Sequence, residues 1–239
     1  MESVRRRRNT KVDERPLIID GDPKAIASEA FRTLRTNLQF TSPDQELKTI
    51  LVTSVGPGEG KSTVTANLAA AWAQSGVRVI LVTCDLRRPV THRIFGVRNS
   101  PGLTGYLSGK ATLEEVIIST RVPGLDLIPG GPIPPNPAEL LQSRAMESCV
   151  EELRDLYDVV LFDGPPAVAV TDAAIMGSQA DGTILVVRAN ETPKDVALHA
   201  KDLLIKANAN LLGVVLNRVN LENQTNYHYY YYYWEEMES

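Results

Sequence analysis

The sequence has few cysteines and no long apolar run. Its 239 residues include two cysteines, Cys84 and Cys149, whose separation fits neither a disulfide framework nor a metal-ligand spacing. No stretch approaches the roughly eighteen apolar residues that cross a bilayer, and no apolar segment follows the N-terminal arginines as a signal peptide would require. We therefore expect a reduced, cytoplasmic protein.

A strong excess of charge of either sign is also lacking. The formal net charge is -4, which gives no reason to expect nucleic-acid binding. The hydrophobic content of 43% and the charged content of 23% are ordinary for a soluble globular protein. The ends differ from the whole, because residues 1–15 carry six basic side chains whereas residues 220–239 carry four acidic side chains and no Lys or Arg.

A chain of this length is often a single domain when it is of the α/β class. Low-complexity sequence is confined to the two ends, and no internal repeat is present. We therefore predict one domain over residues 1–239, with a flexible basic N-terminus at about residues 1–15 and a flexible tail at about residues 220–239.

Short apolar runs alternate with helix-length segments along most of the chain. The runs are apolar on both faces, which is typical of parallel strands that are covered by helices on two sides. We predict an α/β fold with a mainly parallel sheet flanked by helices on both faces. The predicted strands are residues 48–54, 77–83, 125–130, 157–163, 182–188 and 211–219, and the predicted helices are residues 25–40, 61–74, 137–155 and 192–208.

The first predicted strand runs into a glycine-rich segment, SVGPGEGKST. Gly56, Gly58 and Gly60 let the backbone turn tightly and bring its N–H groups close to an anion, and the following helix points its positive end at the same place. Lys61 adds a charge for the β and γ phosphates, and Ser62 supplies a hydroxyl to magnesium. The first glycine of the G-x-x-x-x-G-K-[ST] pattern is a valine here, but the order of strand, loop and helix supports a nucleotide site and an α/β fold of the P-loop NTPase type. The predicted ATP-binding residues are Gly56, Pro57, Gly58, Glu59, Gly60, Lys61, Ser62 and Thr63.

Two later strands end in an aspartate. ILVTCDLRRP places Asp85 just past an apolar strand, and VVLFDGPP places Asp163 in the position of a Walker B carboxylate. A nucleotide site needs such carboxylates near the loop, to hold magnesium and to take a proton from a nucleophile. A single aspartate at a strand end is commonly a helix cap or a turn residue, but two of them downstream of the loop favour a metal site.

Together these motifs resemble those of the bacterial tyrosine kinases called BY-kinases, P-loop enzymes tied to capsule and exopolysaccharide export. EAFRTLRTN looks like the E-x-x-R-x-x-R helix of the family, PGEGKST its Walker A, CDLRRP its Walker A′ and LFDGPP its Walker B. The resemblance implies an ATP-dependent protein-tyrosine kinase in which Lys61, Asp85 and Asp163 are catalytic. It also implies that Ser62, Asp85 and Asp163 hold magnesium.

The Walker A′ segment departs from the family in one place. The pattern D-x-D-x-R reads here Thr83-Cys84-Asp85-Leu86-Arg87, so the first carboxylate is a threonine. Threonine keeps an oxygen but loses the charge and most of the basicity. The enzyme is then slow, relies on Asp85 alone, or is trapped in one state.

Six of the eight tyrosines lie in the last thirteen residues. Such a run has no two-sided pattern and is poor material for a core, but the resemblance gives it a use as the substrate. A seven-residue spacer, 220–226, precedes it, and when fully extended reaches roughly 25 Å. We predict phosphorylation between protomers. The predicted phosphoacceptors are Tyr227, Tyr229, Tyr230, Tyr231, Tyr232 and Tyr233.

The first predicted helix presents two stripes. One is charged, at Glu29, Arg32 and Arg35, and the other is apolar. We expect the apolar stripe to pack on the sheet and the charged stripe to be free. By itself the charged stripe favours a solvent-exposed helix face with salt bridges. The resemblance implies instead that it contacts a neighbouring subunit in a closed ring.

The resemblance also implies partners outside the ring. It predicts a separate membrane activator whose cytoplasmic segment recruits the kinase to the inner face of the cell membrane, and protein substrates that carry tyrosine. Through them the kinase would regulate capsular or exopolysaccharide synthesis and export.

Two other classes of protein stay open. The related partitioning and cell-division ATPases usually carry a lysine that would fall on Gly56, where it is missing. A nucleotide-binding scaffold without useful kinase activity, with the tyrosines as a docking strip, remains possible because of Thr83.

Some polar residues have two readings. Asn217 and Arg218 follow the last predicted strand and either approach the adenine base or form an ordinary turn. Arg87, Arg88 and Asp172 are either functional or members of surface ion pairs.

Overall fold

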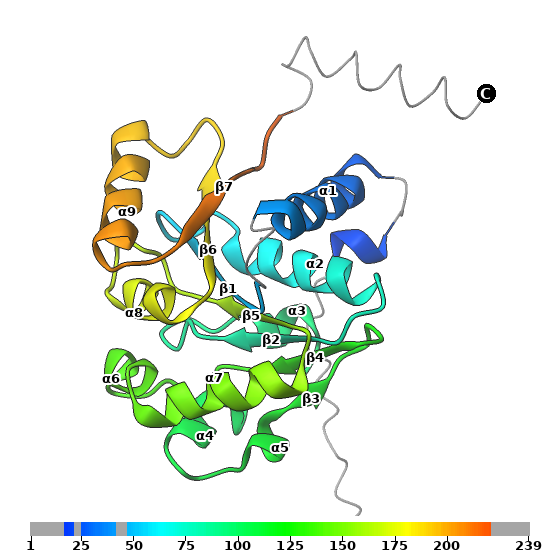
Figure 1. The fold of residues 1–239 in the computed structure, drawn as a ribbon, viewed down its shortest axis with the longest axis vertical. Coiled ribbons are helices and arrows are strands. Elements are labelled where there is room, and N and C mark those ends of the chain that lie inside the picture. Colours follow the sequence, from blue (N-terminus) through cyan, green and yellow to red (C-terminus); the bar gives the residue numbers. More distant parts are fainter. Residues whose placement is uncertain (1–16, 22–24, 42–46, 221–239) are drawn as a thin grey trace, which may run out of the picture.

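A seven-stranded sheet forms the centre of the molecule (Figure 1). The computed structural model describes residues 17–21, 25–41 and 47–220, so the basic N-terminus and all six predicted phosphoacceptor tyrosines lie outside the described residues. The order of the strands is β3-β4-β2-β5-β1-β6-β7. The strands are β1 (Thr49–Ser54), β2 (Val79–Thr83), β3 (Ile118–Ser119), β4 (Leu125–Ile128), β5 (Val159–Asp163), β6 (Gly182–Arg188) and β7 (Leu211–Asn217).

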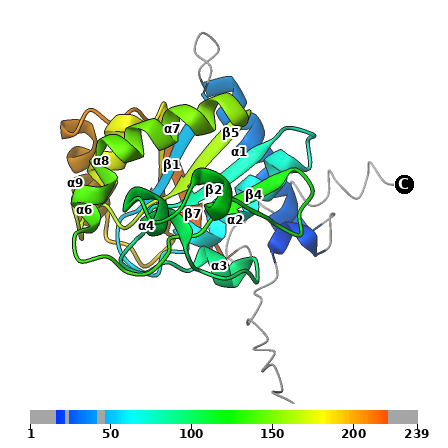
Figure 2. The ribbon, with the colours of Figure 1, turned by 90° about the horizontal axis from the view of Figure 1, so that it is seen from below.

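All strand pairs are parallel except β3 with β4, so the predicted mainly parallel sheet is confirmed. Helices cover both faces of the sheet (Figure 2). They are η1 (Ile18–Asp20), α1 (Ile26–Thr41), α2 (Lys61–Ala73), α3 (Thr91–Ile94), α4 (Gly102–Leu107), α5 (Leu113–Val116), α6 (Pro137–Leu141), α7 (Arg144–Leu156), α8 (Asp172–Gln179) and α9 (Lys194–Lys206).

The alternation of side chains along each strand divides the core into layers. In β5, Val159 and Leu161 join the cluster that contains α2, whereas Val160 and Phe162 join the cluster that contains α7. The central strands are therefore buried on both faces, and burying both faces is a large source of folding free energy.

The helix predicted at residues 137–155 is two helices, which corrects that expectation. Helix α6 ends at Leu141, and α7 begins after Ser143, whose Oγ accepts a hydrogen bond from the backbone N–H of Met146 at 3.3 Å. A serine in this position satisfies a free N–H group of the new helix, so it marks a helix start. Hydrophobic periodicity continues across the break and conceals it.

Helix α1 packs mainly on α2, whereas its apolar stripe was expected to pack mainly on the sheet. Its apolar residues Phe31, Leu34 and Leu38 contact the cluster that α2 shares with the sheet. Helix α1 is therefore an outer layer over the helix that follows the glycine loop (Figure 1).

The parallel arrangement places the ends of three central strands together. Val52 of β1 and Thr83 of β2 are both register partners of Asp163 in β5. The backbone N–H groups of Cys84 and Asp85 both donate to the carbonyl oxygen of Asp163 at 2.9 Å. These contacts bring the segment after β2 to the glycine loop after β1.

Within the described ranges, none of the helices combines the length and the apolar character needed to span a membrane.

Candidate active site

The glycine loop between β1 and α2 has the backbone that its sequence predicts. Gly58 and Gly60 have φ angles of 81° and 94°, in the left-handed region that favours glycine. No heavy atom lies within 4 Å of the position that a Cβ on Gly58 would occupy, so this side of the loop is open. A Cβ on Gly60 would collide with the side chain of Asn217. The loop is thus open on one side and tightly supported on the other.

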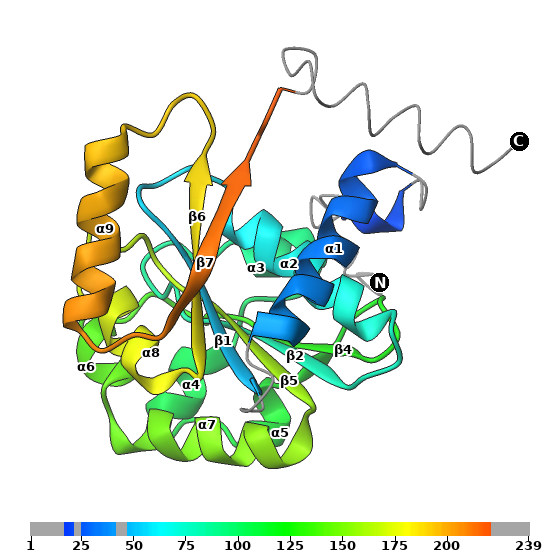
Figure 3. The same ribbon diagram turned by 45° about the horizontal axis from the view of Figure 1, so that its top comes forward.

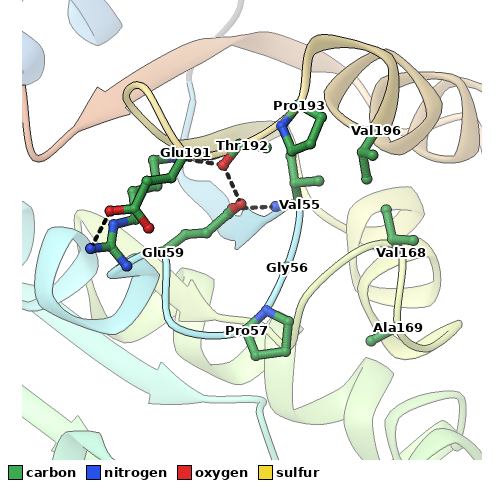
Figure 4. Close-up of a pocket in the computed structure, with 11 residues that line it drawn as sticks. Val55, Gly56, Pro57, Glu59, Val168, Ala169, Glu191, Thr192, Pro193 and Val196 are labelled. Carbon is green, nitrogen blue, oxygen red and sulfur yellow. Dashed lines mark hydrogen bonds and ion pairs between the residues drawn. The ribbon is translucent and has the colours of Figure 1, made fainter.

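Glu59 is turned into the protein (Figure 4). One carboxylate oxygen accepts a hydrogen bond from the N–H of Val55 at 2.8 Å, and the other accepts one from the hydroxyl of Thr192 at 2.7 Å. The side-chain amide of Asn217 donates to the carbonyl oxygen of Glu59 at 2.7 Å. The side chain of Glu59 therefore braces the loop, and the prediction that Glu59 helps to bind the cofactor would rest on its backbone N–H.

Lys61, Ser62, Asp85 and Asp163 come together at the base of the loop. The Lys61 Nζ atom lies 2.9 Å from Asp85 Oδ2, 3.5 Å from Asp163 Oδ1 and 3.2 Å from Ser62 Oγ. All four residues are buried, and Asp163 has no exposed surface. The residues predicted as catalytic and metal-binding therefore form one cluster.

Electrostatics keep Lys61 charged within this cluster. Burial raises the pKa of Asp163, and the positive charge of Lys61 opposes that rise. Burial alone would lower the pKa of Lys61, but the charges of Asp163 and Asp85 outweigh it, so the pKa of Lys61 is raised. Lys61 is consequently protonated at neutral pH.

The donor set fits a magnesium ion. Asp163 Oδ2 is buried and has no hydrogen-bond partner, an arrangement that is costly unless something fills it. Mg²⁺ prefers oxygen ligands and usually binds one or two carboxylates together with phosphate oxygens and water. The described residues contain no group of three or more His, Cys, Asp or Glu side chains for a metal ion, so phosphate oxygens would have to complete the shell.

Thr83 is part of the wall behind this cluster. Its hydroxyl shares a hydrogen bond with the hydroxyl of Thr91, and both residues are fully buried. The neighbouring Cys84 is also buried, and burial raises the pKa of its thiol well above the usual value. An apolar, protonated thiol of this kind is chemically inert.

The arginines after Asp85 have different surroundings. Arg87 forms a two-pronged pair with the fully buried Asp172, with Nε–Oδ2 and Nη2–Oδ1 distances of 2.9 and 3.0 Å. The backbone N–H of Arg88 donates to Asp85 Oδ1 at 3.0 Å, which orients that carboxylate. Arg87 and Asp172 thus form a structural ion pair, whereas Arg88 supports the site through its backbone.

Sequence reasoning missed two supports of the loop. Thr192, just before α9, and Asn217, at the end of β7, each reach Glu59. Nothing in the local sequence around Thr192 marks it. The sequence predicts that Asn217 approaches the adenine base or forms a turn, and the structure adds that its side chain contacts the loop.

The predicted interface residues lie on α1. Arg32 Nη1 is 2.9 Å from Glu29 Oε2, whereas Arg35 Nη1 donates to the carbonyl oxygen of Ala71 in α2 at 2.9 Å. Arg35 is thus already used within its own chain. The contact of these residues with a second subunit stays a prediction.

A pocket of about 350 Å³ lies beside the loop, on the side of α9 (Figure 4). Gly56 and Pro57 form one wall, and Val168, Pro193 and Val196 contribute apolar surface. Lys61 and the two aspartates do not line it. The pocket therefore adjoins the loop without containing the charged cluster.

The hydroxyl pair of Thr83 and Thr91 predicts a pattern of stabilities. Thr83→Val leaves the Thr91 hydroxyl buried without a partner, so we expect it to lower the free energy of unfolding by about 1–3 kcal/mol. The double variant Thr83→Val/Thr91→Val removes both hydroxyls and should recover most of that loss. Urea denaturation measures both variants, and a double variant less stable than the single one would contradict the pairing.

Comparisons with known proteins agree with the geometry. A family model described as an AAA domain matches residues 47–212. Tyrosine-protein kinase YwqD from Bacillus subtilis (strain 168) is 42% identical over 225 residues, which cover 94% of this chain and 94% of that protein.

A second relative is known both as a sequence and as a structure. Tyrosine-protein kinase Etk from Escherichia coli (strain K12) is 40% identical over 205 residues, which cover 85% of this chain and 28% of that protein. The structure of the Escherichia coli ETK kinase domain matches with a TM-score of 0.82 and 36% identity, over 91% of this chain and 86% of that one.

A cell-division ATPase is a more distant match. MinD from Pyrococcus furiosus has a TM-score of 0.62 and 28% identity, over 72% of this chain and 73% of that one. Both values are lower than those of the kinase domain. The chain therefore belongs to the family of bacterial tyrosine-protein kinases and is a protein-tyrosine kinase, as its motifs predicted.

Proposed function

We propose that this kinase transfers the γ-phosphoryl group of ATP to the tyrosines of its own C-terminal tail, between subunits, and thereby regulates capsular or exopolysaccharide synthesis and export. The observation that supports it best is the buried cluster of Lys61, Ser62, Asp85 and Asp163 beneath an open glycine loop. This cluster offers a cation for phosphate, oxygens for magnesium and a carboxylate for a hydroxyl proton.

The residues of the cluster have different roles in the proposed reaction. When bound, ATP supplies the phosphoryl group and Mg²⁺ offsets the charge of the phosphates. The backbone N–H groups of residues 58–60 and the ammonium of Lys61 would hold the phosphates, and Oδ2 of Asp163 together with the Ser62 hydroxyl would hold the cation. In this arrangement the acceptor tyrosine loses its proton to Asp85.

Asp85 is the better of the two carboxylates for that proton. Asp163 has no exposed surface, whereas Asp85 is 5% exposed and lies on the segment that leaves the sheet. Thr83 does not compete, because its hydroxyl is already paired with Thr91. Activity in this chain would thus rely on Asp85 alone. This is one of the outcomes expected from Thr83 in place of the first Walker A′ aspartate.

The direction of the chain at its end supports transfer to a neighbour. The last described residues continue away from the sheet along the direction of β7 (Figure 3). However, Asn217 contacts Glu59, so the base of the tail also lies near the chain's own loop. The length of the tail therefore permits phosphorylation both within one chain and between chains, and a mixing experiment decides between the two.

We further propose that the subunits assemble in a ring through Glu29, Arg32 and Arg35, and that the cytoplasmic segment of a membrane activator recruits this ring to the membrane. Glu29 and Arg32 form an ion pair on α1, with exposed side-chain fractions of 40% and 32%. Both side chains therefore remain accessible to a second subunit.

Mixing a chain that cannot donate phosphate with a chain that cannot accept it tests transfer between subunits. One chain carries Lys61→Met, which removes the phosphate-binding cation, and the other carries phenylalanine in place of all six tail tyrosines. Only transfer between chains can label the Lys61→Met tail, and we expect label from radioactive ATP in the mixture.

Each chain incubated alone is the control, and neither should acquire tail label. Because Lys61→Met also leaves two buried carboxylates without their cation, a Lys61→Arg acceptor that keeps the charge is run in parallel. Absence of label on both acceptors would exclude transfer between subunits.

A charge swap tests the ring. Glu29→Arg/Arg32→Glu keeps an ion pair within α1 but reverses the charges presented to a neighbour, so we expect a smaller species in sedimentation velocity. The swap Lys201→Glu/Asp202→Lys on exposed positions of α9 is the matched control and should leave the assembly unchanged. An assembly of native size in the α1 variant would show that this stripe is only a solvated face.

A further inference from the structure

The segment that follows Asp85 is strongly basic. Residues 86–113 contain no Asp or Glu in twenty-eight positions, which is unusual in a chain that carries 29 acidic residues. One of its cations, Arg87, is neutralised by Asp172. The other cationic side chains of this segment are Arg88, Arg93, Arg98 and Lys110.

Three of these arginines follow Asp85 along the segment that leads into and past α3, and we call them the basic rim: Arg88, Arg93 and Arg98. All three are exposed. Among the described residues, no acidic side chain forms an ion pair with any of them. The positive charge of the basic rim is therefore not compensated by an ion pair with any acidic side chain among the described residues.

The rim is joined directly to the site. The backbone N–H of Arg88 holds Asp85 Oδ1, and the Thr91 hydroxyl holds that of Thr83. Helix α3, which carries Arg93, packs on α2, the helix that begins at Lys61 (Figure 3). A ligand that binds at Arg88 would thus lie close to Asp85, the residue proposed to receive the tyrosine proton.

The rim also has a fixed position. Ile94 and Phe95 anchor α3 in the core, with exposed fractions of 6% and 4%. Asn99 exchanges two hydrogen bonds with Gly131, with its amide donating at 2.6 Å and its oxygen accepting at 3.2 Å. Arginines on such a supported segment bind with little additional loss of backbone entropy.

We propose that the basic rim is a docking surface for acidic residues beside the acceptor tyrosine, so that the kinase selects tyrosines that lie next to carboxylates. This proposal rests on the proposed function and names the substrate class of the same site. The chain's own tail fits it, because Glu235, Glu236 and Glu238 follow Tyr233 closely and no Lys or Arg occurs after Arg218.

The spacing of residues on the tail and on the rim is compatible with this docking. Glu235 is two residues from Tyr233, which corresponds to about 7 Å of extended chain. Arg88 is three residues from Asp85 on the rim side. A tyrosine hydroxyl near Asp85 would therefore leave Glu235 within reach of the start of the rim at Arg88.

Full-length chains test the proposal. The donor carries phenylalanine at the six tail tyrosines, and the acceptors carry Lys61→Arg with either the native tail or a tail with Glu235→Gln, Glu236→Gln and Glu238→Gln. We expect the neutral tail to be phosphorylated about fivefold more slowly at low salt, since each exposed ion pair contributes little and several add up. The difference should shrink as salt screens the charges.

Variants of the donor locate the effect. A donor with Arg93→Ala/Arg98→Ala should phosphorylate the native tail about as slowly as the neutral tail, and should treat both tails alike. Lys201→Ala/Lys206→Ala removes two cations from α9, away from the rim, and should change nothing. A donor with Arg93→Glu/Arg98→Glu should recover activity on a tail in which the three glutamates are lysines.

The outcomes separate this proposal from the proposed function. No phosphorylation of any tail would overturn the proposed function. Equal rates for native and neutral tails with the unaltered donor would overturn the basic rim alone. A slow rim variant that still distinguishes the two tails would also overturn it, because the arginines would then affect the rate without contacting the tail carboxylates.

Discussion

The ammonium group of Lys61 lies between two carboxylates that are almost completely buried. Removing one member of a buried pair typically costs about 3–5 kcal/mol, because the remaining charge has no solvent. The two ion pairs of Lys61 therefore hold three segments of the sequence together: the start of α2, the end of β5 and the segment after β2. The same three groups are those that phosphoryl transfer requires, so the interaction that organises this end of the sheet also organises the proposed chemistry.

The glycine loop depends on a second set of contacts on its outer side. Glu59 connects Val55 to Thr192, and Asn217 occupies the space that a side chain at Gly60 would need. These contacts link the loop to α9 and to the end of β7, the strand from which the tail leaves. A movement of the tail's base is thus mechanically connected to the loop through Asn217.

The sheet and its charged cluster were predictable from local sequence. Strands β1, β5 and β6 are continuous apolar runs that end in turn-forming or polar residues, and parallel strand ends must meet at one edge. This is why Lys61, Asp85 and Asp163 could be placed together. The break between α6 and α7 was missed because Ser143 interrupts no apolar period, and α3, α4, α5 and α8 are too short for periodicity to reveal.

The supports of the loop could not be predicted in the same way. Thr192 and Asn217 lie 133 and 158 residues from Glu59 in the sequence, and their pairing arises only from the packing of β6, β7 and α9 beside β1. The pairing of Thr83 with Thr91 depends likewise on where α3 packs. This hydrogen bond explains how a threonine can replace the Walker A′ carboxylate at position 83, because the buried hydroxyl has a partner in Thr91.

The central claim is that the buried cluster delivers phosphate to the tyrosines of the tail. Mass analysis of the C-terminal peptide after incubation of the purified chain with ATP and Mg²⁺ measures this most directly. The account predicts phosphate on one or more of residues 227–233, and the same peptide from an Asp85→Asn chain should carry little. A chain that hydrolyses or holds ATP while every tail tyrosine remains unmodified, even in the presence of its activator, would contradict the account.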